Sequence, residues 1–319
     1  MSYRVVFMGT PQFAIPTLQE LIDKYSAQGV VGVFTQPDRP RGRGRRAQPS
    51  PVKLLTQQYG IRVLEPESLR DPETQVELKS LRPDVIVVAA FGQILPRTVL
   101  ELAPHGCINV HASLLPRWRG AAPVAASILA GDPTPGATVM KMDVGLDTGP
   151  ILSQRSLAIA PDDTRESLTI RLAQLGAYLL RDTLPDWLAG RIEPRPQDEA
   201  LATYAPQLKK EQGRINWGEP AEDIARQVRA FTPWPGAFTH WQDKALKVLR
   251  STPTDPDPPG VEQDADLLPG TVIAGTGVPA VVTGSGILRL YEVQLAGKRP
   301  MPADAFARGA RDFVGARLA

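Results

Sequence analysis

The chain has 319 residues, 42% of them hydrophobic and 22% charged, with a formal net charge of +2. These values are typical of a globular protein, and the length suits two domains. No apolar run reaches the roughly 18 residues of a membrane span, and the N-terminus lacks the layout of a signal peptide. A single cysteine, Cys107, excludes an internal disulfide, and with only three histidines a Cys/His zinc site is disfavoured. We therefore expect a cytoplasmic protein that binds no membrane.

The first half of the chain alternates apolar runs with helical periodicity. Residues 16–27 carry apolar side chains at helical spacing, and a longer helix is expected after Asp162 or Asp163. Continuous apolar runs are typical of parallel strands and predict strands at residues 4–8, 30–34, 84–90, 107–110 and 137–142. Strands separated by helices indicate right-handed crossovers. This half is therefore predicted to be an α/β domain with a Rossmann-like, mostly parallel sheet.

The second half of the chain has the pattern of a small β domain. Residues 190–206 hold several prolines and acids without periodicity, which predicts a linker. A helix is predicted at Ala221–Phe231, and the short β-like runs after it predict a barrel or sandwich; these runs are residues 246–249, 271–274, 280–283 and 287–293. The Pro/Asp-rich residues 252–270 are predicted to form a mobile surface insert. The expected domains are 1–189 and 207–319, joined by the linker 190–206.

The turn after the first predicted strand begins at Gly9 and contains Pro11, which removes a backbone donor. It lacks the GxGxxG pattern of dinucleotide-binding domains. We interpret Gly9 as the residue that a tight turn requires, and the sequence does not indicate a dinucleotide cofactor.

Two polar residues, Asn109 and His111, alternate near the end of a predicted strand. Alternate residues of a strand point to the same side, and open α/β sheets bind ligands at the carboxyl ends of their strands. A lone asparagine or histidine at a strand end is also common as a satisfied polar residue. For this pair alone, catalytic and structural interpretations therefore stay open.

Asp147 lies between Gly145 and Gly149 in a segment that follows the predicted strand 137–142. Such a sequence is common in simple turns. It also suits a loop that is bent to direct one carboxylate into a site, where the carboxylate would hold the orientation of His111.

Five arginines are interleaved with glycine and proline between residues 38 and 49: Arg39, Arg41, Arg43, Arg45 and Arg46. A run of charges is usually a solvated loop. Cations that repel one another on a mobile loop nevertheless gain most by meeting phosphates, so a nucleic-acid partner is a second interpretation.

The stretches NVHASLLPRWRG, from Asn109, and MDVGLDTG, from Met142, resemble the signatures of folate-dependent formyltransferases. The chain also contains the Gly-Thr-Pro turn that begins at Gly9 and the stretches TQPDRPRGRG, SPVK, AFGQILP, FTPWPGAF and AGKRPM. With these, it resembles over essentially its whole length the members of that family that act on initiator methionyl-tRNA.

This resemblance implies transfer of the formyl group of 10-formyltetrahydrofolate, the co-substrate, to the amino group of initiator methionyl-tRNA, with no metal. The family's catalytic residues fall on Asn109, His111 and Asp147. The Asn109 amide and the His111 ring are expected to donate hydrogen bonds to the oxyanion of the tetrahedral intermediate. Asp147 is expected to support His111 and to relay protons from the amine to the departing folate nitrogen. Cys107 is expected to be a packed strand residue.

The resemblance also implies binding residues. The folate contacts are expected at two segments: Ser113, Leu114, Leu115 and Pro116, and the pterin-covering loop Phe91, Gly92, Gln93, Ile94 and Leu95. The arginine-rich loop is expected to enter the tRNA acceptor stem. The C-terminal domain is expected to be an OB-like barrel that binds tRNA, and the chain is expected to act as a monomer.

Two other functions remain open at this stage. One is a formyltransferase for a small amine, such as an amino sugar nucleotide or a purine precursor, which could use the same catalytic residues. The arginine-rich loop and the C-terminal domain favour tRNA over such an acceptor. The other is a non-catalytic RNA-binding protein that has kept the fold; the complete set of Asn109, His111 and Asp147 argues against it.

Overall fold

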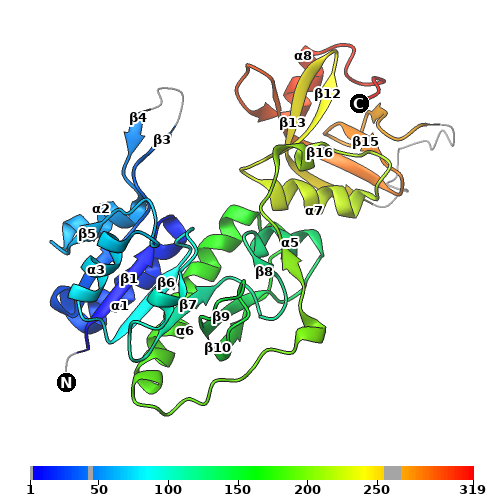
Figure 1. Ribbon diagram of the computed structural model, residues 1–319. Helices are drawn as coiled ribbons and strands as arrows, with labels where there is room; N and C mark the ends of the chain where they lie inside the picture. The colour runs from blue at the N-terminus through cyan, green and yellow to red at the C-terminus, as the bar shows by residue number, and fades with distance from the viewer. Residues whose placement is uncertain (1–2, 42–45, 255–266) are drawn as a thin grey trace. The chain divides into compact units, whose positions relative to one another are not determined.

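The computed structural model describes residues 3–41, 46–254 and 267–319 (Figure 1). The chain forms two compact units that interleave along the sequence. Unit 1 comprises Met1–Pro123, Thr134–Ala158 and Thr169–Ala205, and unit 2 comprises Val124–Pro133, Ile159–Leu168 and Pro206–Ala319. No helix in the described part of the chain is long and apolar enough to cross a membrane.

Unit 1 is built on a seven-stranded sheet in the order β10-β9-β7-β6-β1-β2-β5. The strands β5, β2, β1, β6 and β7 are parallel, whereas β9 runs antiparallel to both β7 and β10. Their bounds are β1 Val5–Gly9, β2 Val30–Phe34, β5 Val63–Leu64, β6 Val85–Ala89, β7 Cys107–His111, β9 Gly136–Lys141 and β10 Ile151–Ser156. The predicted Rossmann-like, mostly parallel sheet is confirmed.

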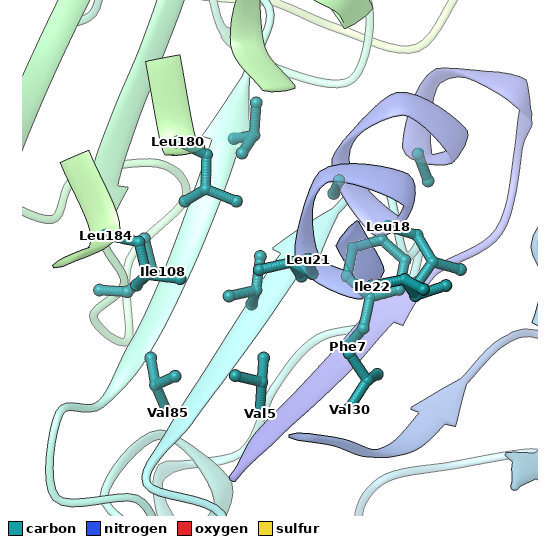
Figure 2. Packing of buried hydrophobic residues seen from close by; sticks show 14 of the residues in the cluster. Val5, Phe7, Leu18, Leu21, Ile22, Val30, Val85, Ile108, Leu180 and Leu184 are labelled. Carbon is teal, nitrogen blue, oxygen red and sulfur yellow. The ribbon is translucent and has the colours of Figure 1, made fainter. Parts of the chain in front are cut away.

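The core of unit 1 explains why its strands read as continuous apolar runs. On one face of the sheet, strand residues pack against α1 (Ile15–Gly29) and α6 (Arg165–Leu188), as Figure 2 shows for Val5, Phe7, Val85, Ile108, Leu18, Leu21, Ile22, Leu180 and Leu184. The alternate strand residues enter a second core with α3 (Pro72–Ser80) and α4 (Arg97–Leu100), and these include Val6, Met8, Ile86, Val88, Leu78 and Val99. Both faces of the sheet are therefore buried.

The arginine-rich segment has a β-hairpin at its base. Strand β3 (Arg39–Arg41) pairs antiparallel with β4 (Arg46–Gln48), whereas Arg43 and Arg45 lie outside the described residues. Beside the hairpin, Lys53 Nζ lies 2.9 Å from Asp38 Oδ2 and 2.7 Å from Glu65 Oε2. These ion pairs fix the chain where it enters the hairpin.

The remaining helices and strands before Gly213 are short. Helix α2 (Pro51–Gln58) is capped by Ser50, whose hydroxyl accepts from the Lys53 backbone N–H at 3.0 Å. The other short elements are η1 (Gln12–Ala14), β8 (Arg119–Gly120), α5 (Pro123–Leu129), η2 (Glu199–Leu201), β11 (Tyr204–Ala205) and η3 (Lys210–Gly213).

Residues 195–205 of the predicted linker pack against unit 1. Strand β11 pairs in parallel with β8, and Arg195 forms an antiparallel bridge with Ile151. Unit 1 accordingly extends to Ala205. The bounds 1–189, 190–206 and 207–319 stay a prediction for the functional domains.

Unit 2 contains an antiparallel sheet in the order β12-β13-β16-β15-β14, with β17 paired to β16. The end of the chain joins the two outer strands, because His240 N–H of β12 donates to Ala319 O and Val272 N–H of β14 donates to Ala316 O, each at 2.8 Å. The bounds are β12 Ala237–Trp241, β13 Lys244–Thr254, β14 Val272–Ile273, β15 Ala280–Val282, β16 Ile287–Leu295, β17 Met301–Pro302, α7 Ala221–Phe231 and α8 Ala303–Gly309. The predicted separate β domain is confirmed.

The predicted insert at residues 252–270 begins later than expected. Strand β13 runs to Thr254, so the first three of these residues belong to the sheet and pair with β16. Residues 255–266 lie outside the described part of the chain.

Candidate active site

Strand β7 carries Asn109 and His111 on one face, as the alternation predicts. Both side chains are largely covered, with exposed fractions of 8% and 7%. Strand β7 lies between β6 and β9, and His111 is its last residue. A buried amide and a buried imidazole thus lie next to each other where a strand ends inside the sheet.

Asp147 lies in the loop between β9 and β10, and that loop reaches His111. The Asp147 Oδ2 atom is 3.7 Å from His111 Nδ1 and accepts a hydrogen bond from the Gly120 N–H at 2.8 Å. Asp147 has the left-handed φ of 54°, which is sparsely populated for residues other than glycine. At Gly149 a Cβ atom would collide with the backbone carbonyl of Lys141, so this position requires glycine.

The ring of His111 is oriented by the turn that follows its strand. Its Nε2 atom lies 3.0 Å from the Trp118 carbonyl oxygen. A carbonyl only accepts, so Nε2 must carry a hydrogen and donate it. The other nitrogen, Nδ1, therefore faces Asp147. Trp118 itself has a positive φ of 60°, a conformation that costs free energy and that the surrounding contacts must hold.

The predicted folate segment 113–116 forms a compact turn. The Ser113 hydroxyl donates to the Arg117 carbonyl at 2.6 Å, and Thr138 Oγ1 donates to the Ser113 carbonyl at 2.6 Å. The Thr138 hydroxyl also accepts from the Leu115 N–H at 3.1 Å. The side chains of Ser113 and Leu115 are buried, whereas those of Leu114 and Pro116 are partly exposed. Thr138, which the sequence did not single out, therefore fixes this turn.

The predicted folate loop 91–95 follows β6 and is held at its first and third residues. The Phe91 carbonyl accepts from Thr10 Oγ1 and from Gln36 Nε2, each at 3.0 Å. The Gln93 amide donates to the Pro66 carbonyl at 2.8 Å and accepts from the Leu69 N–H at 3.2 Å. Phe91 and Leu95 are buried and Gly92 has a φ of +82°, whereas the Ile94 side chain is 77% exposed.

A buried arginine, Arg119, follows the 113–116 turn. The Arg119 side chain is fully buried, and its guanidinium donates to both Glu199 carboxylate oxygens at 2.7 and 2.8 Å. The hydrogen bonds to Glu199 hold the pKa of Arg119 above its usual value, and Arg119 in turn lowers the pKa of the Glu199 carboxyl. The sequence motif contained Arg119, but no local pattern pointed to Glu199.

Cys107 lies at the start of β7 and is fully buried. Burial raises the pKa of its thiol to about 12, and its Sγ contacts the Val99 carbonyl at 3.6 Å. A protonated, buried thiol is a packing residue rather than a nucleophile.

Comparisons with known proteins agree with this arrangement. The model of the formyl transferase family matches residues 3–184, and the model of the formyl transferase C-terminal domain matches residues 207–311. The methionyl-tRNA formyltransferase of Trichlorobacter lovleyi is 49% identical over 309 residues, which cover 97% of this chain and 94% of that protein.

Two solved structures share the fold. An N-formyltransferase from Helicobacter canadensis, in complex with folinic acid and dTDP-3-aminofucose, has a TM-score of 0.66 at 19% identity and covers 90% of this chain and 99% of that one. Methionyl-tRNA formyltransferase from Clostridium thermocellum has a TM-score of 0.54 at 20% identity, covering 79% and 94%. With matches to both family models and a relative similar over almost its full length, the chain belongs to the methionyl-tRNA formyltransferase family of enzymes.

Proposed function

We propose that the protein transfers the formyl group of 10-formyltetrahydrofolate to the amino group of initiator methionyl-tRNA, without a metal ion and in the cytoplasm, where it acts as a monomer. The observation that carries the proposal is the 3.7 Å approach of His111 Nδ1 to Asp147 Oδ2 on the face of β7 that holds Asn109. The near full-length relative named for this activity, and the folinic acid bound to the Helicobacter canadensis protein, support the choice of substrates.

The proposed reaction is an acyl transfer. The lone pair of the methionyl amine attacks the formyl carbon and forms a tetrahedral intermediate whose oxygen becomes negative. The Asn109 amide and the Nδ1–H of a protonated His111 donate to that oxygen, because Nε2 is engaged by the Trp118 carbonyl and preorganised donors stabilise a developing oxyanion. The intermediate collapses when the bond from the formyl carbon to the folate nitrogen breaks. That nitrogen leaves with a proton, and the attacking amine loses one.

Asp147 is the proposed carrier of that proton. Its separation of 3.7 Å from His111 Nδ1 is longer than a hydrogen bond. A substrate atom or a water can therefore lie beside the pair and bind both. In this position the carboxylate takes the proton of the attacking amine and passes it to the departing nitrogen, while His111 stays a donor.

The proposed folate contacts are the 113–116 turn and the 91–95 loop. Both have backbones that are fixed by internal hydrogen bonds. The Ser113 hydroxyl is engaged within its own turn, so we assign it to the shape of the turn rather than to folate. The exposed Ile94 side chain offers an apolar surface to the flat pterin ring.

The proposed tRNA contacts are the arginines of the β3–β4 segment: Arg39, Arg41, Arg43, Arg45 and Arg46. The ion pairs of Lys53 hold Asp38, directly before β3. In unit 2, the partly or fully exposed Lys247, Arg250 and Arg289 lie on the strands β13 and β16. Exposed basic side chains on a sheet can bind the phosphate backbone of a nucleic acid.

A panel of acceptors tests the proposal. Release of tetrahydrofolate from 10-formyltetrahydrofolate is followed with initiator methionyl-tRNA, uncharged initiator tRNA, free methionine and an amino sugar nucleotide. Among these acceptors, we expect turnover only with initiator methionyl-tRNA. Faster turnover with the sugar nucleotide would replace the proposed acceptor by a small amine, and no turnover with any acceptor would favour a non-catalytic RNA-binding protein.

A further inference from the structure

Residues 195–205, here called the strap, join the two loops that carry the candidate site. At one end Ile151 and Arg195 exchange backbone hydrogen bonds of 2.8 and 2.9 Å, directly after the Asp147 loop. At the other end β11 pairs with β8, and the Trp118 N–H donates to Thr203 Oγ1 at 2.9 Å. The strap therefore connects the loop of Asp147 with the turn whose Trp118 carbonyl holds His111.

Gln197 is the strap residue that reaches the Asp147 loop. Its Nε2 donates to the carbonyl oxygens of Asp147 and Gly149, each at 2.7 Å. Its Oε1 accepts from Arg119 Nε at 3.1 Å and from Arg119 Nη2 at 2.9 Å. Carbonyls only accept and a guanidinium only donates, so these partners fix which end of the amide faces the loop.

The remaining contacts of Arg119 make this support rigid. The guanidinium is fully buried and is paired through two hydrogen bonds with Glu199, two residues after Gln197 on the strap. A paired arginine of this geometry has little freedom to turn. The chain of contacts runs from Glu199 through Arg119 and Gln197 to the backbone of Asp147.

Asp147 requires such support because its backbone is in the left-handed region, with φ at 54°. That conformation is costly and persists where the surroundings determine it. The carboxylate must also meet the Gly120 N–H and His111 Nδ1 at the same time. A change of the backbone at this residue would move the carboxylate away from the imidazole.

We propose that Gln197 is a positioning residue for the reaction: it holds the Asp147 backbone so that the carboxylate faces His111. Gln197 itself does not touch the reacting atoms. The inference rests on the proposed function, in which Asp147 carries the proton. A misplacement of about 1 Å can cost up to roughly a hundredfold in rate, so loss of this contact should appear in kcat.

Gln197→Glu is the sharpest variant. One carboxylate oxygen can still accept from Arg119, so the strap keeps its anchor, while the other oxygen replaces a donor and faces two carbonyls. We expect kcat to fall by about tenfold to a hundredfold, with KM for both substrates within about twofold. Gln227→Glu is the matched control, since Gln227 Nε2 on α7 of unit 2 likewise donates to two backbone carbonyls, those of Gln212 at 2.9 Å and Arg214 at 3.1 Å; its kcat should equal that of the wild type.

A double-mutant cycle with Asp147→Asn separates positioning from a general structural role. Single-turnover transfer is measured for the wild type, both single variants and the double variant. Once the carboxylate is gone, its position no longer matters, so Gln197→Glu should then change the rate by less than about twofold. Gln197→Ala repeats the cycle if the glutamate variant does not fold.

The inference is overturned if Gln197→Glu and Gln197→Ala transfer as fast as the wild type, or if each lowers the rate by the same factor in both backgrounds. In these cases the wild type still formylates methionyl-tRNA, so the proposed function stands. Failure of the wild type to formylate methionyl-tRNA is a different result and removes the proposed function together with this inference.

Discussion

His111 Nδ1 and Asp147 Oδ2 lie 3.7 Å apart, although one residue ends β7 and the other lies in the loop between β9 and β10. The Trp118 carbonyl engages the other ring nitrogen, and the Gly120 N–H engages the same carboxylate oxygen. The pair is thus held from both sides, with a separation longer than a hydrogen bond between the two atoms.

Asn109→Ala and His111→Ala should each slow transfer without unfolding the protein. Each variant removes one proposed donor to the oxyanion, and such a loss costs about 2.7–4 kcal/mol of transition-state stabilisation. Steady-state kinetics with a thermal melt measures both effects. His105→Ala, which changes a partly exposed histidine in edge-to-face contact with Tyr3, is the control. Activity near that of the wild type in either variant would remove that residue from the mechanism.

Asp147→Asn should bind folate and tRNA but transfer poorly. The amide keeps the shape of the side chain and loses the charge that accepts a proton. The measurement is kcat over a range of pH, together with the affinity for both substrates. Asp143→Asn is the control on the same loop, because its Oδ1 accepts from the Gly145 N–H and Thr148 Oγ1, which an amide oxygen can also do.

Two results would change the role of Asp147. Unchanged turnover of Asp147→Asn across pH would contradict the proton relay. A loss confined to folate affinity would make Asp147 a binding residue instead.

Arg41→Ala/Arg43→Ala should weaken the use of tRNA and leave folate binding intact. Each lost phosphate contact should flatten the plot of log affinity against log salt by roughly 0.7–0.9 units. Turnover should fall as well, because the arginines would also help to place the aminoacyl end. The control is Arg62→Ala/Arg97→Ala, which removes two exposed arginines that are paired with Glu77 and Glu101. Equal slopes and rates in the wild type and the Arg41/Arg43 variant would identify the segment as solvated charge.

The Arg119–Glu199 pair should give a pH-dependent contribution to stability. Arg119 lowers the pKa of the Glu199 carboxyl, so the charged pair stabilises the fold above the ordinary pKa of a glutamate. This stabilisation is lost as the pH falls through the lowered pKa of the Glu199 carboxyl. Glu199→Gln should therefore reduce Tm at pH 7, and the difference from the wild type should shrink below about pH 4.

Thermal melts measure this difference between roughly pH 3 and pH 7, the range in which carboxyl groups titrate. Glu101→Gln is the control, because both Glu101 and its partner Arg97 are exposed, at 64% and 77%, whereas Arg119 is fully buried although Glu199 is 68% exposed. Pairs that are exposed on both sides contribute little. A Tm difference for Glu199→Gln that is independent of pH would contradict the assignment to the ion pair.

Cys107 should resist alkylation in the native protein. Burial raises the pKa of its thiol to about 12, so the thiolate is scarce and inaccessible at neutral pH. Mass spectrometry after iodoacetamide treatment should show labelling only in denaturant. Rapid labelling of the folded protein together with loss of activity would give Cys107 a role in the site.

The sequence predicts the elements whose signal is local. Strands β1, β2, β6 and β7 are buried on both faces and so read as apolar runs, whereas β10 is an edge strand with an exposed end and was not predicted. The hairpin β3–β4 was missed because its proline and arginines carry no β pattern. Strand β12 was also missed, although its first two residues, Ala237 and Phe238, were part of a family motif.

The residues of the candidate site could be predicted one by one, but not their assembly. Alternation placed Asn109 and His111 on one face, flanking glycines indicated a bent loop at Asp147, and the family resemblance implied their catalytic roles. Nothing local shows that Gln197, 50 residues further along, binds the Asp147 carbonyl. The polar contacts of the strap join distant parts of the chain. The sequence of residues 190–206 has no periodicity and therefore gave no indication of these contacts.

The most direct test of the account is the transfer of an isotope-labelled formyl group from 10-formyltetrahydrofolate to initiator methionyl-tRNA by the wild type, His111→Ala and Asp147→Asn proteins. Hydrolysis of the aminoacyl ester followed by mass spectrometry shows whether methionine carries the label on its amino group. Labelled formylmethionine should appear with the wild type and far more slowly with both variants. Absence of label on methionine with the wild type, while a small amine is labelled, would contradict the proposed function.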